Sequence, residues 1–108
     1  MPTFNSNWSP VFRATQNEND ALRYTINWAG DLDTDTISSD TWTNEDGGLT
    51  IAAESNTTTT STCRLSASDP GLYRVVCKIV TAAGDTLERI IELRVGENNP
   101  VSALSDYV

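Results

Sequence analysis

Apolar and polar residues alternate along most of the chain, in short segments that turn-forming residues separate. The clearest case is residues 21–28, whose apolar side chains share one parity: Leu22, Tyr24, Ile26 and Trp28. A period of two residues is typical of a β-strand with one buried face, whereas a helical face repeats about every 3.6 residues. No segment keeps a helical period beyond about two turns. The chain is therefore predicted to be all-β.

The other strand candidates show the same pattern and are bounded by Gly, Pro, Asn and Asp. In the last of them, Leu87, Ile91, Leu93 and Val95 are expected to face inward, with Arg89 at the outer end of the same row. The segments predict about seven strands, at spacings typical of an immunoglobulin-like antiparallel β-sandwich. Besides residues 21–28, the predicted strands are residues 8–12, 36–44, 49–53, 62–67, 72–81 and 86–95.

Both ends of the chain depart from this pattern, which divides the sequence into three parts. We predict an irregular N-terminal arm (residues 1–10), a β-sandwich domain (residues 11–96) and an irregular C-terminal arm (residues 97–108). Apolar residues on irregular ends are commonly buried against another surface. The arms are expected to dock on other subunits, or else to fold over the edges of their own domain. The candidate contact residues are Phe4, Trp8, Val101, Leu104, Tyr107 and Val108.

A turn with a distinctive sequence precedes the long strand predicted at residues 72–81. Asp69-x-Gly71-x-Tyr73 matches the corner before strand F of immunoglobulin folds, where a tyrosine hydroxyl bonds to the backbone a few residues upstream. Glycine supplies a backbone conformation that bulkier residues resist. The alternative is an ordinary turn followed by a strand with a buried tyrosine. We assign Asp69, Gly71 and Tyr73 as a structural corner.

Composition and charge exclude several classes of function. The 108 residues suit one domain, and no stretch approaches the ~18 apolar residues of a membrane-spanning helix. A net charge of −8 disfavours contact with nucleic acid or with an acidic membrane. The sequence has no histidine, so Ser-His-Asp and Cys-His catalysis are excluded. We expect no enzyme activity, no catalytic residue, no cofactor and no small-molecule substrate.

The cysteines and one acidic run leave alternatives open. Cys63 and Cys77 match no zinc pattern and form either one disulfide or two buried thiols. The N-terminus has no basic segment followed by an apolar run, so we expect a cytoplasmic protein, which favours free thiols.

Asp31, Asp33 and Asp35 alternate in a turn, but the Gly and Glu of an EF-hand loop are missing. A solvated turn without metal is expected, with an irregular calcium site as the alternative.

Several stretches resemble a family of small proteins from the structural gene clusters of tailed bacteriophages and prophages. The likeness covers roughly residues 20–96. Two departures are Asn27, where the family has Asp, and Asp40, which lies in a Ser-rich stretch. The matching stretches are Tyr24-x-Ile26-Asn27-Trp28, Asp35-Thr36-Ile37-Ser38-Ser39-x-x-Trp42, Gly48-Leu49-Thr50, Gly71-x-Tyr73-x-Val75-x-Cys77 and the hairpin from Thr81 to Arg89.

This resemblance implies an immunoglobulin-like virion component at the neck or tail, of the kind described as a fiber–tail adaptor. It implies partners among the portal, neck, tail-tube and fiber proteins, and a ring of several copies. The protein is then expected in the virion, and in the host cytoplasm during assembly, with the arms and the Thr-rich residues 54–61 as contacts. The alternative is a carbohydrate- or cell-surface-binding module in which an exposed Trp42 contacts sugar. A buried Trp42 excludes that role.

Overall fold

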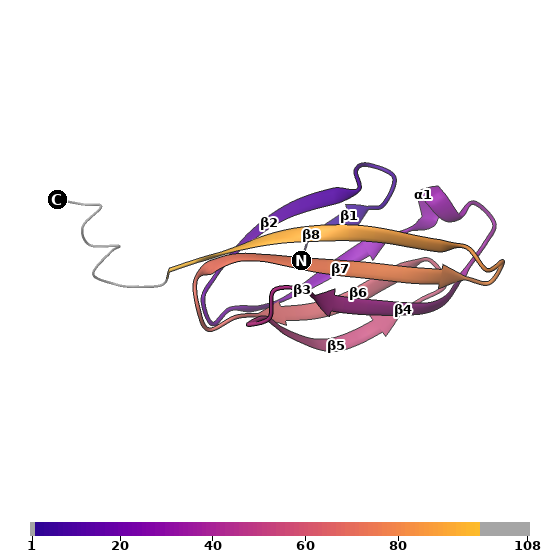
Figure 1. Ribbon diagram of the computed structural model, residues 1–108. Helices are drawn as coiled ribbons and strands as arrows, with labels where there is room; N and C mark the ends of the chain where they lie inside the picture. The colour runs from indigo at the N-terminus through magenta and orange to yellow at the C-terminus, as the bar shows by residue number, and fades with distance from the viewer. Residues whose placement is uncertain (1, 98–108) are drawn as a thin grey trace.

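The structure is a computed structural model that describes residues 2–97, and these residues form a two-layered β-sandwich (Figure 1). Alternating apolar residues build the strands, and turns rich in Gly, Asn and Asp connect them. The elements are β1 (Thr3–Asn5), β2 (Val11–Asn17), β3 (Ala21–Asn27), α1 (Ala29–Leu32), β4 (Ile37–Asn44), β5 (Thr50–Asn56), β6 (Thr60–Ser66), β7 (Gly71–Thr81) and β8 (Thr86–Gly96).

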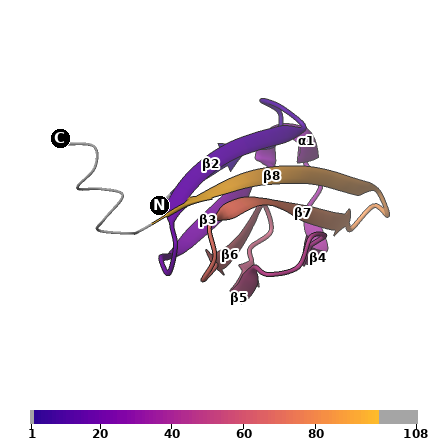
Figure 2. The ribbon, with the colours of Figure 1, turned by 60° about the vertical axis from the view of Figure 1, so that its left-hand side comes forward.

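Each layer is a four-stranded sheet. Sheet I has the strand order β1-β3-β6-β5, and sheet II has the order β2-β8-β7-β4. Figure 2 shows β2, β8 and β7 side by side in one layer, with sheet I behind them. The N-terminal strands β1 and β2 run parallel to β3 and β8, and the other neighbouring strands are antiparallel. The predicted immunoglobulin-like sandwich is confirmed.

Residues 2–97 form eight strands, where about seven were predicted for the chain. The additional strand is β1, which is separate from β2. The predicted acidic turn after β3 contains the short helix α1. Neither element has enough residues to show a period in the sequence. No helix among residues 2–97 is long and apolar enough to cross a membrane.

The core fills the space between the sheets and follows the predicted parity. Tyr24, Ile26 and Trp28 are fully buried, whereas Leu22, with the same parity, is 39% exposed near the start of β3. On β8 the inward row also agrees with the prediction, because Ile91, Leu93 and Val95 are buried. The other buried apolar residues are Phe12, Leu32, Ile37, Trp42, Cys63, Leu65, Ala67, Tyr73, Val75, Cys77 and Ile79.

Arg89 faces inward at the outer end of the β8 row and joins three parts of the chain. Its Nε donates a hydrogen bond of 2.8 Å to the carbonyl oxygen of Ser6, and its Nη2 lies 2.8 Å from Oδ2 of Asp31 on α1. The guanidinium lies 5.3 Å from the ring centroid of Trp28, within cation–π range. The Ser6 hydroxyl also donates to Asp31, at 2.7 Å. These contacts fix α1 and the segment after β1 against β8.

Part of the predicted N-terminal arm, residues 1–10, forms β1 of the sandwich, so this segment follows the alternative in which the arm folds over its own domain. Thr3, Phe4 and Asn5 pair with residues 25–27 of β3. The Phe4 ring stacks on Phe12 of β2 at 4.8 Å between centroids. A Cβ atom on Gly30 would lie 2.6 Å from the Asn7 side chain, so a residue without a side chain lets this segment pass over α1. Burial of Phe4 and backbone pairing outweigh the irregular local sequence.

The corner before β7 contains the hydrogen bond typical of immunoglobulin folds. The Tyr73 hydroxyl donates to the carbonyl oxygen of Asp69 at 2.8 Å. Gly71 has a φ of +156°, which L-residues rarely adopt. The hydrogen bond fixes the crossover between β6 in sheet I and β7 in sheet II.

Replacing Tyr73 by phenylalanine is expected to lower the free energy of unfolding by about 1 kcal/mol, because the ring stays buried and only the hydrogen bond is lost. Urea denaturation followed by tryptophan fluorescence measures the change. Lys78→Met on the same strand is the control, because its side chain is exposed and it should leave stability within ~0.5 kcal/mol of the wild type. Equal stability of Tyr73→Phe and the wild type would contradict the role of the hydroxyl.

Candidate interaction surfaces

The end of the sandwich at which β8 finishes carries exposed apolar side chains beside a cation. Leu72 is 63% exposed and pairs in register with Arg94 on β8. Leu22 lies at the same end and is also exposed. We call Leu22, Leu72 and Arg94 the exit end, because residues 98–108 follow β8 from here. The sequence pattern did not single these residues out.

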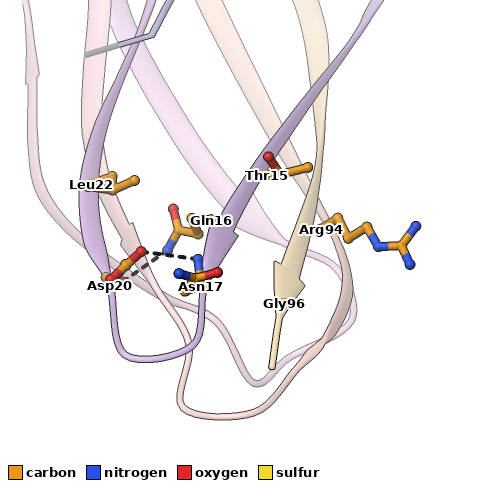
Figure 3. A pocket seen from close by; sticks show the side chains of 7 residues that line it. All are labelled: Thr15, Gln16, Asn17, Asp20, Leu22, Arg94 and Gly96. Carbon is orange, nitrogen blue, oxygen red and sulfur yellow. Dashed lines mark hydrogen bonds between the residues drawn. The ribbon is translucent and has the colours of Figure 1, made fainter. Parts of the chain in front are cut away.

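Two hollows flank Arg94 at the exit end. The first has a volume of about 420 Å³ (Figure 3), and the second has about 380 Å³ and includes Leu72 and Glu97. The turn beneath the first hollow is held by Asp20, whose Oδ2 accepts a hydrogen bond of 3.1 Å from the backbone N–H of Asn17. This end therefore offers concave surface, apolar side chains and a positive charge. The residues that line the first hollow are Thr15, Gln16, Asn17, Asp20, Leu22, Arg94 and Gly96.

The predicted arm residues fall into different environments. Phe4 is partly buried and packs against the core, with its ring on Phe12, which agrees with the alternative that the N-terminal segment folds over its own domain. Trp8 follows β1, and 67% of its surface is exposed. The C-terminal candidates Val101, Leu104, Tyr107 and Val108 lie outside the described residues and stay a prediction.

The Thr-rich stretch forms the end of β5, a tight turn and the start of β6. The backbone N–H of Thr57 donates to the carbonyl oxygen of Thr60 at 2.9 Å, and the two hydroxyls lie 2.7 Å apart. β5 is an edge strand with mostly exposed residues, and its pairing with β6 is irregular between Ala52 and Ser55. Such a bulge discourages strand addition at a sheet edge. The turn at Thr57 is the better-defined contact candidate within residues 54–61.

Trp42 lies in the core of the sandwich. Only 6% of its surface is exposed, on the inner face of β4 opposite Cys77 of β7. An aromatic ring that binds sugar must offer a face to solvent, so Trp42 cannot have that role. The carbohydrate-binding alternative therefore loses the residue on which it depended.

The acidic residues of the D-x-D-x-D run make separate contacts. Asp31 pairs with Arg89, and Asp33 ends α1 with a φ of 56°. Oδ1 of Asp35 accepts hydrogen bonds from the backbone N–H groups of Thr36 and Ala83, at 2.8 and 3.3 Å. Hydrogen bonds, the strongest from Thr81, hold the pKa of Asp35 below its usual value. Within residues 2–97, no group of three or more His, Cys, Asp or Glu is arranged to hold a metal ion.

Both cysteines are free and fully buried on the inner faces of β6 and β7. Burial raises the pKa of the Cys63 thiol to about 12, and it also raises the pKa of Cys77. Neutral thiols in such surroundings behave as small apolar residues rather than as nucleophiles.

The two thiols are expected to react with a disulfide reagent at pH 8 at least about a hundredfold more slowly in the folded protein than after unfolding. The reasons are the raised pKa, which leaves little thiolate, and the lack of access. Release of thionitrobenzoate, with and without guanidinium chloride, measures both rates. The single variants Cys63→Ala and Cys77→Ala each keep one thiol, so they show which rate belongs to which cysteine. Fast reaction of either thiol in the folded protein would contradict its burial.

Taken together, the fold and these surfaces define an immunoglobulin-like β-sandwich module whose exposed features suit contact with other proteins. The model of the podophage GP4 fiber-tail adaptor protein gp77 family matches residues 16–94, which is more than half of the chain. The chain belongs to this family of phage structural adaptors. No curated protein matches the sequence.

Solved structures with the same fold have little sequence in common with the chain. The PKD domain of the KIAA 1837 protein is 17% identical, with a TM-score of 0.55 over 85% of this chain and 86% of that domain. The cysteine protease inhibitor EhICP2 of Entamoeba histolytica is 6% identical, with a TM-score of 0.55 over 86% and 92% of the two chains. A Photobacterium 2,6-sialyltransferase gives 11% identity and a TM-score of 0.57 over 81% of this chain, which spans only 17% of the enzyme. These similarities show the fold alone.

Proposed function

We propose that the chain is a non-enzymatic structural adaptor that connects fibers to the tail of a podophage virion. The observation that carries the proposal is the family match over residues 16–94, which includes all of β3 to β7, most of β8 and the end of β2. The proposed partners are neck, tail-tube and fiber proteins. The protein assembles in the host cytoplasm and stays in the particle in several copies.

The exit end supports this role, because it gives the sandwich two ways to hold a partner. Its hollows and the exposed Leu72 can receive apolar side chains, and Glu97, the last described residue, lines one of the hollows. We propose that Val101, Leu104, Tyr107 and Val108 insert into a neighbouring virion protein. A rigid sandwich with a short apolar segment can thereby link two components, and several copies give avidity where each contact is weak.

Disruption of the gene in the phage that encodes this chain is expected to give particles with filled heads and without fibers. Electron microscopy and mass spectrometry of purified particles measure fiber content. Supplying the full chain in trans should restore the fibers. A chain that ends at Glu97 should not, although circular dichroism should show the same fold. Particles that keep all their fibers without this chain would refute the proposed function.

A further inference from the structure

The outer face of sheet II has a charge opposite to that of the protein as a whole. Alternate residues of β2, β8 and β7 point outward, away from the buried row of each strand. They include four basic and two acidic residues, a net charge of +2, whereas the whole sequence has −8. A partner for this face is therefore expected to be acidic. The charged residues of the face are Arg13, Arg74, Lys78, Arg94, Glu88 and Glu92.

An apolar row crosses the middle of this face. Val11 of β2 and Val76 of β7 both pair in register with Ile90 of β8, and all three are half-buried. Charged residues lie on both sides of the row. Among residues 2–97, the side chains of Arg74 and Lys78 have no ion-pair partner. An apolar strip with unpaired cations at its rim has the composition of a protein-binding surface.

Two copies that pair these faces about a two-fold axis centred on Ile90 of β8 bring like charges together. When the two-fold axis runs along β8, the row of Arg13, Glu92 and Arg74 on one copy faces the same row of the other copy in reverse order. Arg13 then faces Arg74, and Glu92 faces Glu92. With the axis along the apolar row, Glu92 faces Glu88 and Arg74 faces Lys78. Like charges in contact across an interface are unfavourable in both arrangements. An axis along the strands midway between β8 and β7 instead places Glu92 opposite Arg74 and Glu88 opposite Lys78, so a symmetric dimer is the rival arrangement that the charge exchange below distinguishes.

The opposite charge pattern is present on the same molecule, at the end formed by α1 and the β7–β8 turn. A hollow of about 350 Å³ there is lined by Asp31, Asp35 and Asp85, among other residues. Asp33 follows α1, and Trp8 lies in the segment that passes over α1. Trp8 is the most exposed large apolar side chain among residues 2–97. We call Trp8, Asp33, Asp35 and Asp85 the α1 end. Asp31 lies there too, but its carboxylate already pairs with Arg89.

We propose that the α1 end of one copy docks on the outer face of sheet II of a second copy. Trp8 covers the apolar row around Ile90, and the aspartates lie next to Arg74 and Lys78. Trp and Arg are the residues that most often dominate binding energy at interfaces. Because the two surfaces differ, the contact is head-to-tail and can close into a ring. This inference rests on the multi-copy arrangement of the proposed function, but purified protein tests it separately.

Light scattering of the purified full chain, over a range of concentrations and salt, is the first test. The mass is expected to exceed the 11.8 kDa of one chain, to rise with concentration and to fall with added salt. Trp8→Ala should weaken the association at least about tenfold while the protein stays folded. A monomer under all conditions would overturn the inference.

A charge exchange between the two surfaces tests the pairing itself. The face variant is Arg74→Glu/Lys78→Glu. The end variant is Asp33→Asn/Thr34→Lys/Asp85→Lys, in which asparagine tolerates the φ of 56° at position 33. Each variant alone should be monomeric, because its two surfaces now carry like charges. Mixing the variants should restore assemblies larger than dimers, because every contact again joins opposite charges. A mixture that stops at dimers would mean face-to-face pairing and would overturn the inference.

The matched control makes the same type of change on the other sheet. Arg23 and Arg64 are exposed and lie opposite each other on β3 and β6. Arg23→Glu/Arg64→Glu should leave the assembly unchanged, and an equal loss would show that net charge alone drives association. Circular dichroism and thermal melting confirm that each variant is folded. A monomeric variant that still attaches fibers would refute this contact and leave the proposed function intact.

Discussion

Replacing Trp28 by alanine is expected to lower the free energy of unfolding by about 3–5 kcal/mol, the usual range for a large aromatic residue removed from a core. Trp28 is fully buried directly after β3, and it is the largest of the fully buried side chains. The truncation leaves a cavity between the sheets. It also removes the ring beneath the Arg89 guanidinium, which then lies against empty space. A loss of this size is a large part of the stability of a small domain.

Urea or guanidinium denaturation measures this loss, with circular dichroism as the signal because Trp28 is itself a fluorophore. Trp8→Ala is the matched control, because it removes the same side chain from a position that is 67% exposed, and at protein concentrations at which the chain is monomeric it should change stability by less than ~0.5 kcal/mol. Trp28→Phe should be intermediate, because the indole Nε1 has no hydrogen-bond partner that phenylalanine would lose. Equal stability of Trp28→Ala and Trp8→Ala would mean that Trp28 does not organise the core.

The parity of apolar residues predicted the sandwich because burial of one face imposes a period of two on each strand. It placed Ile26, Trp28 and Ile91 inside correctly. The same argument failed for Leu22, which is 39% exposed, because parity does not report where along a strand its face begins to be covered. It also failed for β1, because three residues are too few to display a period.

The candidate surfaces were harder to predict, because they depend on which strands are neighbours and in which register. Arg89 and Asp31 are 58 residues apart in the sequence, and only the fold brings them within 2.8 Å. The row of Val11, Ile90 and Val76 likewise exists only through the pairing of β2, β8 and β7. In the sequence each of these residues is a single apolar residue between polar neighbours. The exposed Trp8 and the acidic run from Asp31 to Asp35 were each identified from the sequence, but their position at the same end of the sandwich was not.

Replacing Gln16 by leucine is expected to lower the free energy of unfolding by about 2–4 kcal/mol, because it leaves three buried or partly buried polar groups without a partner. Gln16 on β2 is buried, and its Nε2 donates to the carbonyl oxygens of Asp20 and Leu65, at 3.0 and 3.1 Å. Its Oε1 accepts the Tyr24 hydroxyl at 2.7 Å. Because β2 belongs to sheet II, and Tyr24 and Leu65 to sheet I, this one side chain joins the two layers.

A double-mutant cycle with Tyr24→Phe separates the hydrogen bond from the change in shape. Tyr24→Phe alone should lower the free energy of unfolding by about 1–2 kcal/mol, because it removes one of the three bonds to Gln16. The double variant should lose at least ~1 kcal/mol less than the two single losses combined, because it leaves no unpaired hydroxyl. Additive losses would contradict a direct bond between Gln16 and Tyr24. Denaturation by urea at neutral pH supplies all four values.

The same pair predicts part of the behaviour of the protein in alkali. Burial, and then the charge of Asp20, raise the pKa of Tyr24 to about 12, whereas an unfolded tyrosine has a pKa near 10. Ionisation of the unfolded chain therefore lowers stability as the pH rises from about 10 to 12, and the contribution of Tyr24 is intact below that range. Tyr24→Phe should lose less stability than the wild type between these pH values. Cys63→Ala serves as a comparison. The raised pKa of the Cys63 thiol gives a second decline in stability that starts near pH 9, and this variant lacks that decline. An unchanged alkaline decline in Tyr24→Phe would mean that the Tyr24 hydroxyl ionises as readily in the folded protein as in the unfolded chain.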